Sequence, residues 1–205
     1  MSIRDWEGLQ ESARQGFGDA ILCMALLITL ERGNQASALE AVNEIGVGET
    51  ARFYRDGLFF RMHMVAARAF APSRDKDDTH LRAAIDYLKT NDHCSQQSDP
   101  ALRKRLTAAI SRFDLVAESP ARAKIERFRH KQMAHVASYG DELELPIIDE
   151  LFKFVRDTSE VWEALAHGAG ICSVTLASQL DWHVLRADWF WRHIERVDIA
   201  SANAP

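Results

Sequence analysis

One apolar stretch decides the fold class: FGDAILCMALLITLER, at residues 17–32. It has helical spacing, and the pair Gly33-Asn34 that follows it is a typical helix stop. We therefore predict a buried helix here. The longest apolar run inside it, residues 20–30, is eleven residues long and is broken only by Thr29. A membrane span needs about 20 residues, so no contact with a membrane is expected.

Helical spacing recurs along the rest of the chain, and no stretch shows the sustained apolar/polar alternation of a strand bounded by hairpin turns. Most of the five prolines and ten glycines stand where helices should stop. Ser98 or Asp99 before Pro100, and the pair Ser119-Pro120, are typical helix starts. We predict an all-α helical bundle of seven or eight helices joined by short loops. They cover residues 17–32, 36–45, 50–70, 79–88, 100 onward, 121–139, 146–167 and 175–197.

The composition is that of an ordinary globular protein. The chain has 205 residues, of which 47% are apolar and 27% are charged, and these values exclude a collagen-like chain, a fully disordered chain and a disulfide scaffold. No internal repeat or domain boundary is evident. We expect one all-α domain over residues 1–205, with an appended C-terminal helix at about residues 173–197 and a frayed tail.

The cysteines and the first residues indicate a cytoplasmic protein. Cys23, Cys94 and Cys172 are an odd set without Cys-x-x-Cys spacing, so neither structural zinc nor a disulfide framework is supported. Free thiols are typical of a reducing cytoplasm. The opening residues MSIRDW include an acid and lack the apolar core of a secretory signal.

Basic residues gather in one part of an acidic chain. The formal net charge is −5, which argues against a protein that coats nucleic acid by bulk charge. Residues 103–131 hold nine basic and three acidic side chains, so they carry +6 and leave −11 for the rest of the chain. Such a segment can bind phosphates, or it can be a solvated helix face. The nine are Arg103, Lys104, Arg105, Arg112, Arg122, Lys124, Arg127, Arg129 and Lys131.

The segment RFRHKQMAH, at residues 127–135, concentrates three cations and two imidazoles. An imidazole with a pKa of about 6.5 can exchange a proton with the 2′-hydroxyl or the leaving oxygen of RNA at neutral pH. A guanidinium can hold the scissile phosphate with two hydrogen bonds and offset the charge that the transition state gains. Metal-free RNA cleavage needs these two kinds of group.

Spacing alone leaves the geometry of this segment open. On one straight helix, Arg129 and His135 would lie about 120° apart. Arg127, Lys131 and His135, spaced by four residues, would form a tighter stripe. Either the helix is distorted, or Arg129 and His135 meet by another route, such as a dimer. A helical histidine beside cations is also commonly a surface or capping residue.

The run RHKQMAH, at residues 129–135, resembles the signature of HEPN domains, the higher eukaryotes and prokaryotes nucleotide-binding superfamily. Its lysine and its Ala-His pair are similar to the AbiU-type abortive-infection branch, where Arg-Asp-Lys-x-x-Ala-His is the usual form. FYRDGLFFR at residues 53–61 and ARAFAP at residues 67–72 resemble the long helix of that branch. A short helix at residues 80–88 and Pro146 follow in the right order. The resemblance covers roughly residues 20–168, which would be the HEPN-like core.

This resemblance implies a homodimeric, metal-independent ribonuclease with no cofactor, a toxin or phage-defence effector that an antitoxin could restrain. It implies that Arg129 binds phosphate and that His135 transfers protons. It also implies that His130 supports a cleft that both subunits line. Lys131, Arg127 and Arg122 are the candidates for further contacts with RNA.

Two features depart from the family pattern. His130 stands where Asn or Asp is commoner. Tyr139 lies four residues after His135, whereas the acceptor tyrosine of the toxin branch silenced by adenylylation follows its histidine by two residues, so we do not expect that regulation here. Some members of the superfamily have no demonstrated activity. An inactive helical interaction protein, or one that binds nucleotides or RNA, is therefore the alternative.

Other candidate groups give weaker signals. A metal-dependent hydrolase ranks last because no familiar ligand spacing links the late histidines, His167, His183 and His193. Lys104 and Arg105 could track RNA phosphates or lie on a solvated face. The last helix carries three tryptophans that could stack on bases but more often cover a core or an oligomer interface: Trp182, Trp189 and Trp191.

Overall fold

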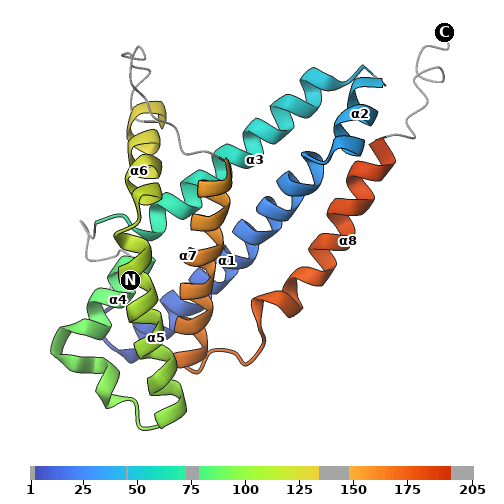
Figure 1. The fold of residues 1–205 in the computed structure, drawn as a ribbon. Helices are drawn as coiled ribbons and strands as arrows, with labels where there is room; N and C mark the ends of the chain where they lie inside the picture. The colour runs from blue at the N-terminus through green and yellow to red at the C-terminus, as the bar shows by residue number, and fades with distance from the viewer. Residues whose placement is uncertain (1–2, 45, 73–78, 134–147, 195–205) are drawn as a thin grey trace.

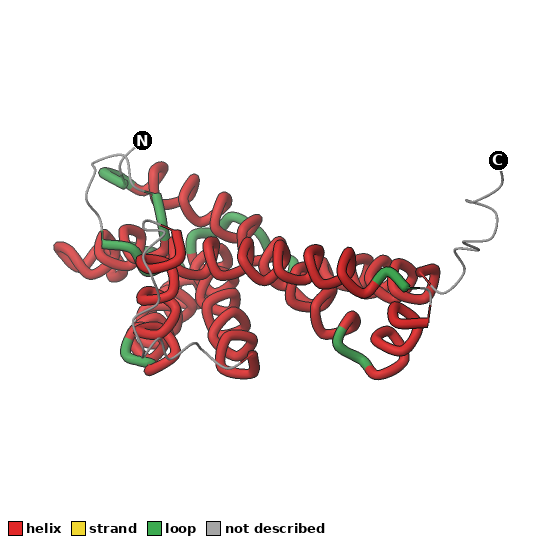
Figure 2. The backbone as a smooth tube through the Cα atoms, turned by 90° about the horizontal axis from the view of Figure 1, so that it is seen from above, coloured by secondary structure: helices red, strands yellow, loops and turns green. Residues whose placement is uncertain are grey.

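The computed structural model describes residues 3–44, 46–72, 79–133 and 148–194. Within these ranges every element is a helix or a loop, as Figure 2 shows, so the predicted all-α class is confirmed. Eight α-helices and one 3-10 helix, η1, follow one another along the chain. They are α1 (Trp6–Gly33), α2 (Ala36–Glu44), α3 (Gly48–Ala69), α4 (Leu81–Lys89), η1 (Thr90–Gln96), α5 (Pro100–Ala117), α6 (Pro120–Met133), α7 (Ile148–Gly168) and α8 (Leu176–Ile194).

Helix α1 is the centre of the bundle. It packs along α7 and α8 and also contacts α3 and α4 (Figure 1). Its buried side includes Leu9, Ala13, Phe17 and Leu27. Among the described helices it is also the one long and apolar enough to cross a membrane, a test that a core helix passes equally well. The predicted buried helix at residues 17–32 is thus the core of the fold.

The helix begins eleven residues earlier than the apolar stretch suggested. Asp5 caps it, because its carboxylate accepts a hydrogen bond from the Gly8 amide at 2.8 Å. In the first three turns the buried residues Leu9 and Ala13 alternate with polar residues. This narrow apolar stripe explains why the N-terminal extension was not predicted.

Two glycines of α1 lie directly against tryptophan side chains of α7 and α8. A Cβ atom added to Gly16 would lie 2.2 Å from ring carbons of Trp162 on α7. One added to Gly33 would lie 2.3 Å from the ring of Trp191 on α8. Both distances are far below van der Waals contact. The indole of Trp191 also donates a hydrogen bond to the Thr29 carbonyl at 2.9 Å, which fastens α8 to α1.

The described helix ends agree with most of the predicted signals. Asp99 rather than Ser98 caps α5, since its carboxylate accepts from the Ala101 amide at 2.7 Å. The cap of α4 is His80, because the Nδ1 atom of His80 accepts from the Ala83 amide at 3.2 Å. Between α4 and α5 the chain forms the 3-10 helix η1. The predicted helix ends at residues 139 and 197, and the start at residue 146, lie outside the described residues.

Candidate functional site

Helix α6 carries the candidate residues and rests on the bundle through two buried side chains. Ile125 and Phe128 are almost inaccessible to solvent, and α6 contacts α3 and α7. The ring of Phe128 lies 4.6 Å from the ring of His63 and 6.4 Å from the ring of Phe59, both on α3. These aromatic contacts fix the rotation of α6 about its own axis, and so fix which of its side chains face outward.

Arg127 and Arg129 flank the buried Phe128 on its two sides. Arg127 is exposed and Arg129 is partly buried. Neither guanidinium makes a hydrogen bond or an ion pair within the described part of the chain. Both are therefore available to an anionic ligand such as a phosphate.

The remaining motif residues are described only in part. His130 and Lys131 belong to the last turns of α6, and their side chains lie outside the described residues. His135 also lies outside them. The distance between Arg129 and His135, and the predicted cleft between two subunits, therefore stay predictions.

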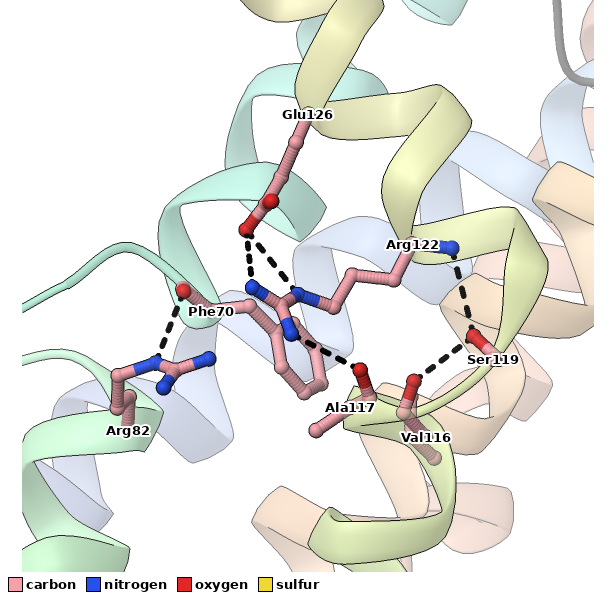
Figure 3. A network of polar contacts seen from close by, with 7 residues as sticks. All are labelled: Phe70, Arg82, Val116, Ala117, Ser119, Arg122 and Glu126. Atoms are coloured by element: carbon pink, nitrogen blue, oxygen red, sulfur yellow. Dashed lines mark hydrogen bonds and ion pairs between the residues drawn. The ribbon is translucent and has the colours of Figure 1, made fainter.

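Arg122 has a structural role in this fold. Figure 3 shows its guanidinium between the end of α5 and the first turns of α6. It donates to the Ala117 carbonyl at 2.9 Å and, through two nitrogens, to the Glu126 carboxylate at 3.1 and 2.8 Å. Its amide donates to the Ser119 hydroxyl at 3.3 Å. A phosphate would have to displace these partners, and the contact of Arg122 with RNA stays a prediction.

The basic segment at residues 103–131 is divided in space. Lys104 and Arg105 lie near the start of α5, whereas α6 continues away from the other end of that helix (Figure 1). Helix rise alone puts Arg105 about 18 Å from Ala117 along α5. Three cations of this segment already have carboxylate partners: Arg112 pairs with Glu160, Arg122 with Glu126, and Lys124 with Glu150. Arg127 and Arg129 thus stand out as cations without a carboxylate partner in the described part of α6.

A buried histidine supports the motif helix and was not singled out from the sequence. His63 is 1% exposed, and its ring is in contact with Phe59 and Phe128. Its Nδ1 atom lies 3.1 Å from the Phe59 carbonyl and donates to it, while Nε2 has no partner among the described residues. Burial lowers the pKa of His63 from 6.5 to about 4, against the opposing effect of the Phe59 carbonyl. The imidazole is therefore neutral at pH 7.

The only sequence signal for His63 is its position in the apolar run LFFRMHMVAA, at residues 58–67. A histidine among apolar residues in a helix is typically a core residue. That it would contact the helix bearing the motif could not be read from the spacing, because residues 70–119 separate α3 from α6 in the chain.

Other kinds of site find little support in the described ranges. No group of three or more His, Cys, Asp or Glu side chains there is placed to hold a metal ion. Burial raises the pKa of the Cys23 thiol to about 12, with Asp19 contributing, so this thiol is not a thiolate nucleophile at neutral pH. Cys94 is buried as well.

Comparison with known proteins gives one match. A model of the HEPN_AbiU2 family, described as AbiU2, matches residues 3–189. The match runs from before the start of α1 to near the end of α8 and includes the whole motif segment. No curated protein and no solved structure matches the chain significantly.

Proposed function

The chain belongs to the AbiU2 family, an abortive-infection family of HEPN-like proteins, and from this premise we propose that it is a metal-independent ribonuclease. Its biological role would be that of a toxin or phage-defence effector. The proposal joins the family to the two chemical groups in residues 127–135, guanidinium and imidazole, that cleavage of RNA without a metal requires.

One observation carries the proposal: among the described residues, the guanidinium of Arg129 has no carboxylate partner. Arg112, Arg122 and Lys124 each bind a carboxylate in the folded chain. Arg129 binds none within the described residues, although it is partly buried. A guanidinium in this position can form charge-assisted hydrogen bonds with an anionic ligand. A phosphate group of RNA is such a ligand.

Each motif residue then has a distinct role. Arg129 holds the scissile phosphate and stabilises the charge that develops on it. His135 takes the proton of the 2′-hydroxyl or gives one to the leaving 5′-oxygen. His130 supports the cleft. Lys131 and Arg127 contact flanking phosphates, which sets affinity more than rate.

The proposal includes a homodimer in which the motifs of two subunits line one cleft. If one straight helix carried both residues, Arg129 and His135 would point about 120° apart, and a single copy would not aim both at one phosphate. A second copy could supply the missing group. An antitoxin that covers this surface would block access of RNA. The proposal also includes a cytoplasmic location, where the protein would meet its RNA substrate.

The experiment is cleavage of a mixed RNA pool in excess chelator. His135→Ala should lower the rate by about 100- to 10,000-fold, the usual effect of losing a general acid or base. Arg129→Lys should also be strongly impaired, because an ammonium cannot make the two-pronged phosphate contact. Arg105→Ala is the matched control, since it removes an exposed cation from α5 and should keep most of the activity.

Three outcomes would contradict the proposal. Inactive wild-type protein would favour a helical interaction protein without catalysis. Equal rates for wild type and His135→Ala would indicate a different site or a contaminating nuclease. Loss of activity in chelator alone would indicate a metal-dependent hydrolase.

A further inference from the structure

Helix α8 is apolar on two opposite faces. Its inner face packs on α1 and α2 and includes Leu180 and Trp191, both buried. Its outer face presents Trp182, Leu185 and Trp189, which are 56%, 62% and 62% exposed. At 100° per residue these three outer positions fall within about 60° of one another and lie opposite the inner pair. A helix that is apolar all round is usually buried all round.

The outer face of α8 belongs to an exposed apolar patch of considerable area. Next to it, Phe190 packs against Tyr54 of α3 with ring centroids 5.3 Å apart, and both rings are partly exposed. An open hollow of about 570 Å³ runs over this face. Aromatic side chains offer about 150–250 Å² each, so the five exposed residues leave about 500 Å² of apolar surface uncovered. That is as large as the largest apolar patch of a typical monomer, which is often functional.

We propose that this outer face of α8 binds the same face of a second copy of the chain, with the two helices parallel. A two-fold pair would bury the exposed side chains of Trp182, Leu185 and Trp189 of both chains against one another. The spacing of Trp182, Leu185 and Trp189 is that of positions a, d and a of a coiled-coil seam. The occupant is therefore a helix with an identical seam.

The charges beside the seam select the parallel orientation. Asp181 and Asp188 lie on one flank of the seam and Arg186 lies on the other. In a parallel pair of helices, the residue directly before the first seam position faces the residue five places later on the partner helix. Here these two residues are Asp181 and Arg186. Asp181 would thus meet Arg186 of the second copy, twice by symmetry. An antiparallel pair would instead oppose acid to acid and arginine to arginine.

Two of these three charges, Asp181 and Arg186, are accessible to such a partner. Asp181 and Arg186 are exposed, and the guanidinium of Arg186 lies over the ring of Trp182, 4.5 Å from its centroid. Asp188 is already paired with Arg32 at 2.9 Å. Among the described side chains of this face, two acids lie beside a single arginine, which makes the face a poor match for RNA, because RNA requires a basic groove next to its stacking rings.

This interface is separate from the motif. Helices α6 and α8 lie on opposite sides of the molecule (Figure 1), so pairing through α8 leaves α6 uncovered. The inference does not rest on the proposed function. If the chains also pair through the motif, a closed assembly that uses both interfaces would be a tetramer, and breaking the α8 interface would again halve the mass.

Sedimentation of the full chain at micromolar concentration tests the inference. Wild type should have at least twice the 23.2 kDa of one chain, and Leu185→Glu should halve the observed mass with an unchanged circular dichroism spectrum. Leu115→Glu is the matched control, because Leu115 is an equally exposed leucine on α5, and it should keep the wild-type mass.

Charge variants test the orientation. Asp181→Arg should weaken the pair by about tenfold or more in dissociation constant, and the swap Asp181→Arg with Arg186→Asp should restore it. Monomeric wild type, or Leu185→Glu with the wild-type mass, would overturn the inference. So would a Trp182→Ala variant that binds single-stranded RNA more weakly than wild type while its mass is unchanged.

Discussion

His63 makes the contact between α3 and the motif helix sensitive to pH. Its imidazole is buried between Phe59 and Phe128, and burial lowers its pKa from 6.5 to about 4. In the unfolded chain the same imidazole titrates at about 6.5. Between these two values the unfolded state takes up a proton that the folded state does not. The stability that depends on neutral His63 is therefore complete above about pH 6.5 and is lost as the pH falls towards 4.

The size of the effect follows from the pKa difference. At about 1.4 kcal/mol per pKa unit, the full loss is about 3 kcal/mol, and about 2 kcal/mol of it falls between pH 6.5 and pH 5. His63→Phe removes the titrating group and keeps an aromatic ring between Phe59 and Phe128. It gives up one hydrogen bond, worth about 1 kcal/mol, and also removes a buried nitrogen without a partner. The variant should thus be within about 1 kcal/mol of wild type at pH 7.5.

Urea unfolding at pH 7.5 and at pH 5 provides the assay. The unfolding free energy of His63→Phe minus that of wild type should rise by about 2 kcal/mol when the pH is lowered. If His63→Phe and wild type lose stability in parallel, the burial argument for His63 is refuted.

Three further substitutions test the packing described above, each by urea unfolding at neutral pH. Gly16→Ala should cost about 1–3 kcal/mol or more, because its Cβ would overlap Trp162, whereas Gly18→Ala, with open space around it, should be neutral or stabilising; equal effects would contradict the close approach of α1 and α7. Arg122→Ala should cost about 1–2 kcal/mol, since it removes the hydrogen bond to the Ala117 carbonyl of α5 and the ion pair with Glu126 within α6, and an unaffected stability would leave the predicted RNA contact as its main role. Asp99→Ala should cost about 1 kcal/mol through loss of the α5 cap, and no loss would show that the cap is dispensable.

The helices whose apolar pattern is dense could be predicted from the sequence. Residues 17–32 are the clearest case, since they are apolar on several sides and lie at the centre of the bundle. Asp99 before Pro100 gave the start of α5 correctly because capping is a local interaction. The first turns of α1 were missed because tertiary contacts, rather than a local pattern, bury Leu9 and Ala13 there.

The candidate site was less predictable, because its features depend on contacts between distant segments. The nine basic residues looked like one cluster, and the fold divides them and pairs Arg112, Arg122 and Lys124 with acids. Charge counts do not reveal such pairing. Likewise, the three tryptophans of the last helix differ in role: Trp191 covers the core as expected, whereas Trp182 and Trp189 are exposed. Only the position of α8 on α1 distinguishes them.

The chemical ends of the RNA fragments test the central claim most directly. Purified protein should be incubated with one defined RNA strand in excess chelator, and the fragments analysed by mass spectrometry. If Arg129 holds the phosphate while His135 activates the 2′-hydroxyl, cleavage should continue without metal and yield 2′,3′-cyclic phosphate and 5′-hydroxyl ends. An intact strand, or fragments that carry 5′-phosphate ends and form only when metal is supplied, would contradict the claim.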